Sequence, residues 1–138
     1  MKDLLVLLRA MQIYTQNAHH LVKGVVFHQD HEFFGEVYEA VGDDFDDVAE
    51  RIVGLFGEEP LSLGELMQGV MMKLQGAPSV GVKENKVFYQ HLLGMEKELC
   101  HLVDMICQAN PSYGTEQLVT EICNKSEMRQ YKIKQRLK

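Results

Sequence analysis

The sequence has no tryptophan, only three prolines and only three cysteines, and it has no long uninterrupted apolar run. Scarce proline together with eight methionines favours long helices over a sheet of short strands. The early run 4–8 has five apolar residues and stops at Arg9, so it is too short for a secretory signal. No other stretch approaches the length of a membrane span. We therefore expect an all-α protein without a membrane segment.

The cysteines, Cys100, Cys107 and Cys123, are odd in number and form no Cys-x-x-Cys pair. Disulfide frameworks use paired cysteines in oxidising compartments, and zinc sites use close cysteine pairs. All three lie in apolar segments with helical spacing. They are predicted to be buried free thiols, which indicates a cytoplasmic protein.

Positive charge is scarce except at one end of the chain. The 138 residues carry a net charge of −6, with 8 Lys and Arg against 19 Asp and Glu in 1–124 but 6 against 1 in 125–138. An acidic body repels phosphate, so only 125–138 could contact DNA, and weakly. The length and a hydrophobic content of 46% fit a single domain over 1–138.

Apolar residues recur at helical spacing in four long segments. The pattern predicts helices over 3–23, 29–56, 83–109 and 115–137. Between the second and third, we expect one or two short helical turns and a Gly- and Pro-rich connection at 76–81. Two tight connections and one long middle crossover describe the ferritin-like variant of the four-helix bundle.

Two groups of possible metal ligands lie on the second predicted helix. Asp46 and Glu50 are four residues apart, so they share a helix face within about 40° and can converge on one cation. His31 lies 15 residues before Asp46, which is about 22 Å along the axis. Antiparallel packing of the first two helices brings His19 beside His31. The stretch "GDDFDDVAER" also fits a solvated acidic face.

A histidine pair and a carboxylate pair this far apart cannot hold one ion within a single chain. They can meet if a second copy lies antiparallel across a two-fold axis, so that histidines of one chain face carboxylates of the other. Imidazole with two carboxylates suits iron, manganese or zinc. The spacing therefore predicts an intersubunit metal site with at least two copies of the chain.

The string "NAHHLVKGVVFHQDHEFFGEVYEAVGDDFDDVAERI" resembles the region joining the first two helices of Dps proteins, which are mini-ferritins. "LSLGELM" and "GTEQLVTEICNKSEMRQYKIKQRL" resemble the middle segment and last helix of that family. The resemblance implies a shell of twelve subunits that oxidises ferrous iron, usually with peroxide, at two-fold interfaces and stores it as ferric mineral. It implies His19, His31, Asp46 and Glu50 as the iron ligands and catalytic residues.

The chain departs from the family pattern at several positions. Members usually carry an acidic iron-site residue four positions after the second histidine, where this chain has Gly35. The resemblance therefore leaves two functions open: a working ferroxidase, or a ferritin-like shell or DNA-associated protein with weakened or lost oxidation. The family commonly binds DNA through a basic N-terminal arm, whereas this chain is expected to start directly at its first helix.

Two further residue pairs are weaker ligand candidates. Glu98 and His101 have the Glu-x-x-His spacing of larger ferritins, but a second copy of that motif is missing, so they rank below the interface site. His28 and Asp30 are more typical of solvated turn residues than of ligands.

Overall fold

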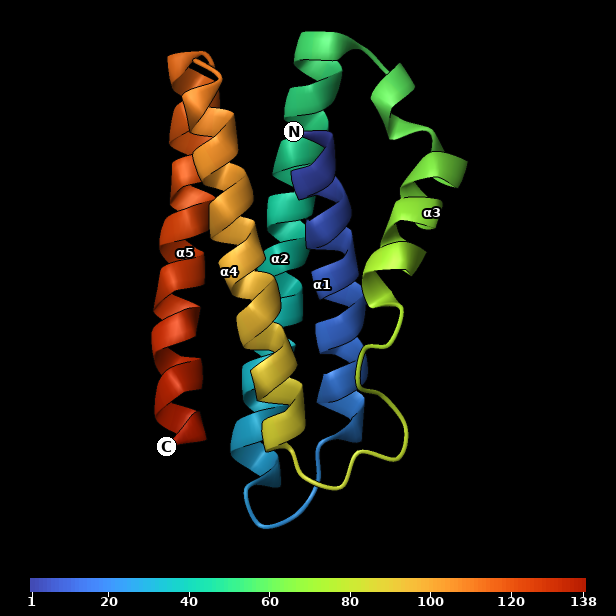
Figure 1. The fold of residues 1–138 in the computed structure, drawn as a ribbon, viewed down its shortest axis with the longest axis vertical. Helices are drawn as coiled ribbons and strands as arrows, with labels where there is room; N and C mark the ends of the chain where they lie inside the picture. Colours follow the sequence, from blue (N-terminus) through green and yellow to red (C-terminus); the bar gives the residue numbers. More distant parts are fainter.

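The computed structural model describes all residues from 1 to 138, and every regular element is a helix (Figure 1). None of the helices is long and apolar enough to cross a membrane. The elements in chain order are α1 (Lys2–Leu21), α2 (Phe27–Phe56), the single 3₁₀ turn η1 (Glu59–Leu61), α3 (Leu63–Leu74), α4 (Lys86–Gln108) and α5 (Tyr113–Leu137).

The four long helices form two antiparallel pairs. Helix α1 packs mainly against α2, and α4 packs mainly against α5. Figure 1 shows that the chain leaves the far end of α2, passes through α3 beside α1, and returns along the bundle before α4 begins. The predicted all-α architecture with four long helices is confirmed, and the observed helices agree with the predicted ones within three residues at every end.

The middle segment was predicted incorrectly as one or two short turns. It contains the 12-residue helix α3, whose Leu66 and Val70 lie four residues apart and are buried. At Gly69 an added Cβ would lie 3.0 Å from Val6 Cγ1, so the missing side chain lets α3 approach α1 closely. Packing on α1 therefore stabilises a helix whose own sequence signal is weak.

Helix α1 is the most deeply buried element because α2, α3 and α4 all pack on it. Neighbouring residues along α1 are buried, whereas in a helix with one exposed face some of them would face solvent. Four of its leucines are fully buried: Leu4, Leu5, Leu7 and Leu8. The apolar run near the start of the chain is thus a core helix.

Candidate functional site

The two predicted histidine ligands lie side by side where α1 ends and α2 begins. The rings of His19 and His31 stack with centroids 3.6 Å apart and planes 19° apart. His19 Nδ1 lies 2.6 Å from the backbone oxygen of His31, and His31 Nδ1 lies 2.7 Å from that of His19. The prediction that antiparallel packing brings the two histidines together is confirmed.

These reciprocal contacts fix the tautomer of both rings. A backbone carbonyl can only accept a hydrogen bond, so each Nδ1 carries the proton and donates it. In a neutral ring, each Nε2 therefore keeps a free lone pair. Histidines that ligate metals are commonly oriented in this way, with one ring nitrogen donating to a carbonyl while the other faces the ion.

Gly35 makes room for the ring of His19. A Cβ added at Gly35 would lie 3.0 Å from His19 Cε1 and 3.1 Å from its Nδ1, tighter than ordinary contacts. The same imidazole also packs against the ring of Tyr38 in a T-shaped arrangement, with ring centroids 5.4 Å apart. Gly35, which replaces the acidic residue of the family pattern, therefore lies against the His19 ring and leaves space for it.

The predicted carboxylate ligands lie in the second half of α2. Asp46 and Glu50 are both exposed to solvent. Glu50 borders an open hollow of about 480 Å³ beside α5, together with Asp47, Arg51, Gly54, Leu55 and Leu118. Neither carboxylate belongs to a group of three or more potential ligands whose donor atoms lie within 4.8 Å of one another. Within one chain, the histidine pair and the carboxylate pair stay separate, as their spacing on α2 requires.

Asp30 is a structural residue, and its interpretation as a solvated turn residue was wrong. It is fully buried and accepts hydrogen bonds from Asn85, Tyr89 and Arg136. Burial raises the pKa of Asp30, but the three donors lower it more, so its net pKa lies below the ordinary value. Asp30 therefore joins the start of α2 to α4 and α5, whereas His28 is exposed.

The alternative Glu-x-x-His pair on α4 lies apart from other potential ligands of the same chain. Glu98 forms an ion pair with Lys73 of α3, and His101 is exposed. The two residues are not part of any cluster of three potential ligands.

Half of the basic residues in 125–138 are used inside the fold. Each of three cations pairs with a buried carboxylate, and those carboxylates belong to α2 and α4; the pairs are Lys125–Asp44, Arg129–Glu96 and Arg136–Asp30. Lys132, Lys134 and Lys138 are exposed and form no ion pair. The positive charge available to a phosphate backbone is therefore smaller than the sequence indicates.

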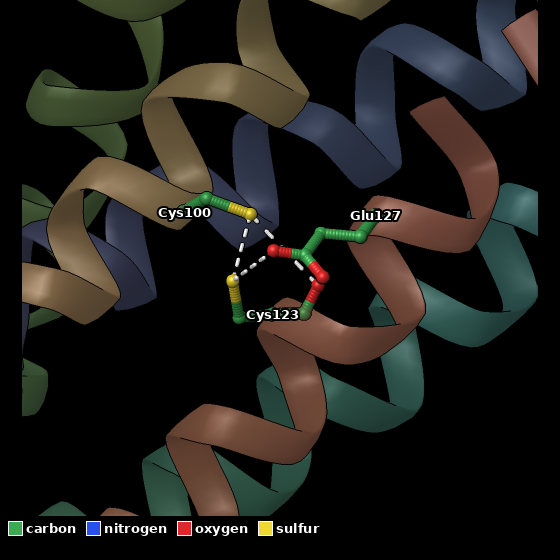
Figure 2. A group of neighbouring side chains, drawn as sticks. All are labelled: Cys100, Cys123 and Glu127. Carbon is green, nitrogen blue, oxygen red and sulfur yellow. Dashed lines mark hydrogen bonds between the residues drawn. The ribbon is translucent and has the colours of Figure 1, made fainter. Parts of the chain in front are cut away.

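One group of potential ligands was missed in the sequence. Cys100, Cys123 and Glu127 bring their sulfur and oxygen atoms together between α4 and α5 (Figure 2). The cysteines are free, but all three are half-buried, so the prediction of buried thiols was wrong. The four-residue spacing of Cys123 and Glu127 was visible, but the position of Cys100 opposite them depends on how the two helices are aligned.

Comparison with known proteins gives one consistent relationship. No protein-family model matches the chain. It is 27% identical to a nutrient stress-induced DNA-binding protein of a Nostoc species over 94% of this chain and 71% of the relative. It is 30% identical to a protein of the same name from a Synechococcus species over 91% of this chain and 71% of the relative. The chain therefore belongs to the family of these nutrient stress-induced DNA-binding proteins, the Dps family.

Proposed function

We propose that this protein is a cytoplasmic mini-ferritin that oxidises ferrous iron at sites shared between two copies of the chain and stores the ferric product. Iron is the substrate and cargo of this reaction. The observation that carries the proposal is the His19–His31 pair with both Nδ1 atoms donating to carbonyls. It is joined by Asp46 and Glu50, a carboxylate pair farther along α2 that an antiparallel second copy could bring to these histidines.

The ligand set suits this chemistry. Imidazole nitrogen and carboxylate oxygen are good ligands for ferrous iron, and carboxylates favour the ferric product more strongly because of its higher charge. In the proposed reaction, two ferrous ions each give one electron to a peroxide molecule. The peroxide takes up two protons, its O–O bond breaks, and it leaves as two waters. The acidic body of the chain would concentrate cations near the site.

A second copy is also favoured by apolar surface that one chain leaves uncovered. Large apolar side chains on α3 face solvent, with exposed fractions between 39% and 75%: Leu63, Met67, Met71 and Met72. Exposed apolar patches of this kind mark association surfaces. We propose that α3 belongs to a ferritin-like crossover that packs between copies, and that the copies assemble into a shell of twelve.

Iron oxidation tests the ligand assignment directly. Ferrous iron with peroxide should produce ferric absorbance quickly with the wild-type protein. Asp46→Asn combined with Glu50→Gln should lower the rate by at least about tenfold, because each removes a charged ligand. Asp43→Asn, an exposed acidic change on the same helix, is the matched control and should leave the rate unchanged. A folded, assembled wild-type protein that oxidises iron no faster than buffer would instead support the shell without oxidation.

Mixed assemblies test whether the site is shared between copies. One variant lacks His19 and His31, and the other lacks the carboxylates of Asp46 and Glu50. Each alone has only broken sites. Random co-assembly of equal amounts gives mixed dimers in half of the cases, each with one intact site, so about one quarter of wild-type activity should return. If the mixture stays as inactive as its parents, the ligands do not come from two chains.

DNA association is the second candidate function, because both relatives carry DNA binding in their names. The exposed Lys132, Lys134 and Lys138 are the residues in 125–138 that remain free to contact phosphate. Replacing all three by glutamine should weaken a gel shift and reduce the salt dependence of binding by about one ion per lysine contact. Lys97→Gln, an exposed change on α4, is the control. Deleting 125–138 would be uninformative, because Lys125, Arg129 and Arg136 hold buried carboxylates.

A further inference from the structure

A cluster of two thiols and a carboxylate lies between α4 and α5, apart from the proposed iron ligands. The thiol of Cys123 donates to Cys100 Sγ at 2.8 Å, and Cys123 Sγ lies 3.9 Å from Glu127 Oε1. Figure 2 shows the Cys100 side chain coming from α4 and the other two from successive turns of α5. Among all His, Cys, Asp and Glu residues, these form the one group of three whose ligand atoms lie within 4.8 Å of one another.

The cluster contains the carboxylate of Glu127, and no basic side chain forms an ion pair with it. Glu127 takes part in none of the ion pairs of the fold. Burial, the hydrogen bond to Cys100 and the nearby negative groups raise the pKa of Cys123 to about 12. The polar donor that reaches the cluster is the uncharged amide of Gln130, 3.6 Å from Cys100 Sγ. A bound cation would reverse this balance, because it stabilises thiolate and carboxylate together.

We propose that Cys100, Cys123 and Glu127 form a binding site for a thiophilic divalent cation of the zinc type. Two sulfurs and one oxygen supply three of the four ligands of tetrahedral zinc, and water can take the fourth position because Glu127 is exposed. Thiolate ligands exclude magnesium and calcium as the preferred ions. Each thiol that binds releases its proton to solvent as the sulfur–metal bond forms.

Little movement is needed to form this site. Zinc–sulfur bonds of about 2.3 Å at a tetrahedral angle place the two sulfurs about 3.8 Å apart, so they must separate by about 1 Å. Rotation of two half-buried side chains can supply this without moving the helices. A disulfide would need the sulfurs to approach to about 2.05 Å and would leave Glu127 without a role.

Cobalt(II) titration of the reduced protein without oxygen tests the proposal. Cobalt bound to thiolate gives a sulfur-to-metal charge-transfer absorption in the near ultraviolet, whereas a histidine–carboxylate site does not. We expect this band to saturate at one cobalt per chain and zinc to abolish it by displacement. The Cys100→Ser and Cys123→Ser variants should lose the band, and Glu127→Gln should weaken cobalt binding by about tenfold or more.

Two control variants separate this cluster from the third thiol and from the proposed iron ligands. Cys107→Ser changes the cysteine that lies outside the cluster and should keep the band. His31→Ala disables the proposed iron site and should also keep it, so either proposal can fail alone. Because Glu127 is exposed, Glu127→Gln remains informative even if a serine variant unfolds. Absence of the band in folded, reduced wild-type protein would overturn the site, as would equal affinity in Glu127→Gln.

Discussion

The replacement of Asp30 by alanine removes a charge that joins three helices. Asp30, on the first turn of α2, is buried and precedes the histidine of the proposed iron site. Asn85 Nδ2 donates to it at 2.8 Å and the Tyr89 hydroxyl at 2.6 Å. Arg136 donates twice, from Nε at 3.1 Å and from Nη2 at 3.0 Å. Four hydrogen bonds thus disappear with one carboxylate.

The loss of unfolding free energy in Asp30→Ala depends on which partners of Asp30 stay buried after the carboxylate is removed. Removing one partner of a buried ion pair costs about 3–5 kcal/mol of unfolding free energy. The side chain of Arg136 is 27% exposed, so water recovers part of its interaction. Asn85 and Tyr89 stay buried. The Tyr89 hydroxyl loses its acceptor, whereas the Asn85 amide keeps its hydrogen bond to the backbone oxygen of Lys23. We therefore expect a loss near the lower limit, about 3 kcal/mol, which is a large share of the roughly 5–15 kcal/mol typical of a domain.

Urea denaturation followed by circular dichroism measures this loss. Wild type and variants must be compared at one protein concentration, because association changes apparent stability. Glu32→Ala, an exposed change two residues later on α2, is the matched control and should lie within about 0.5 kcal/mol of wild type. If Asp30→Ala were no less stable than Glu32→Ala, the buried network would not stabilise the fold.

Three further predictions concern stability in acid, the contact between Gly35 and His19, and the N-terminal cap of α5. Since the folded pKa of Asp30 is lowered, its stabilisation is complete above the ordinary value of about 3.9 and is lost as pH falls through the lowered pKa. Asp30→Ala should therefore flatten the acid dependence of the urea midpoint. Gly35→Ala should push His19 from its position and slow ferrous oxidation by about tenfold, with circular dichroism unchanged. Ser112→Ala removes the oxygen that accepts from the backbone N–H of Thr115 and should cost about 1 kcal/mol in urea unfolding.

The sequence predicted the helices well because their signal is local. Apolar spacing is a property of neighbouring residues. Helix α2 ends at Phe56, as predicted, and the next residue, Gly57, has a φ of 83°. The His19–His31 contact was also predictable, since a short turn between antiparallel helices places their adjoining ends together. Helix α3 was underestimated because its stability comes from packing on α1, which no window of its own sequence contains.

The sequence alone determined the all-α class, the long helices and the separation between the histidine and carboxylate pairs, because each depends on spacing along the chain. Only the tertiary structure decided which polar residues meet across helices. In the folded chain, Asp30 is buried and paired with Arg136, and half of the cations in 125–138 form ion pairs. Cys100 lies opposite Cys123. The physical reason is that these contacts depend on the rotation and sliding of one helix against another. Packing of the whole core fixes the rotation and the sliding of each helix, and the periodicity of side chains within one helix does not predict either.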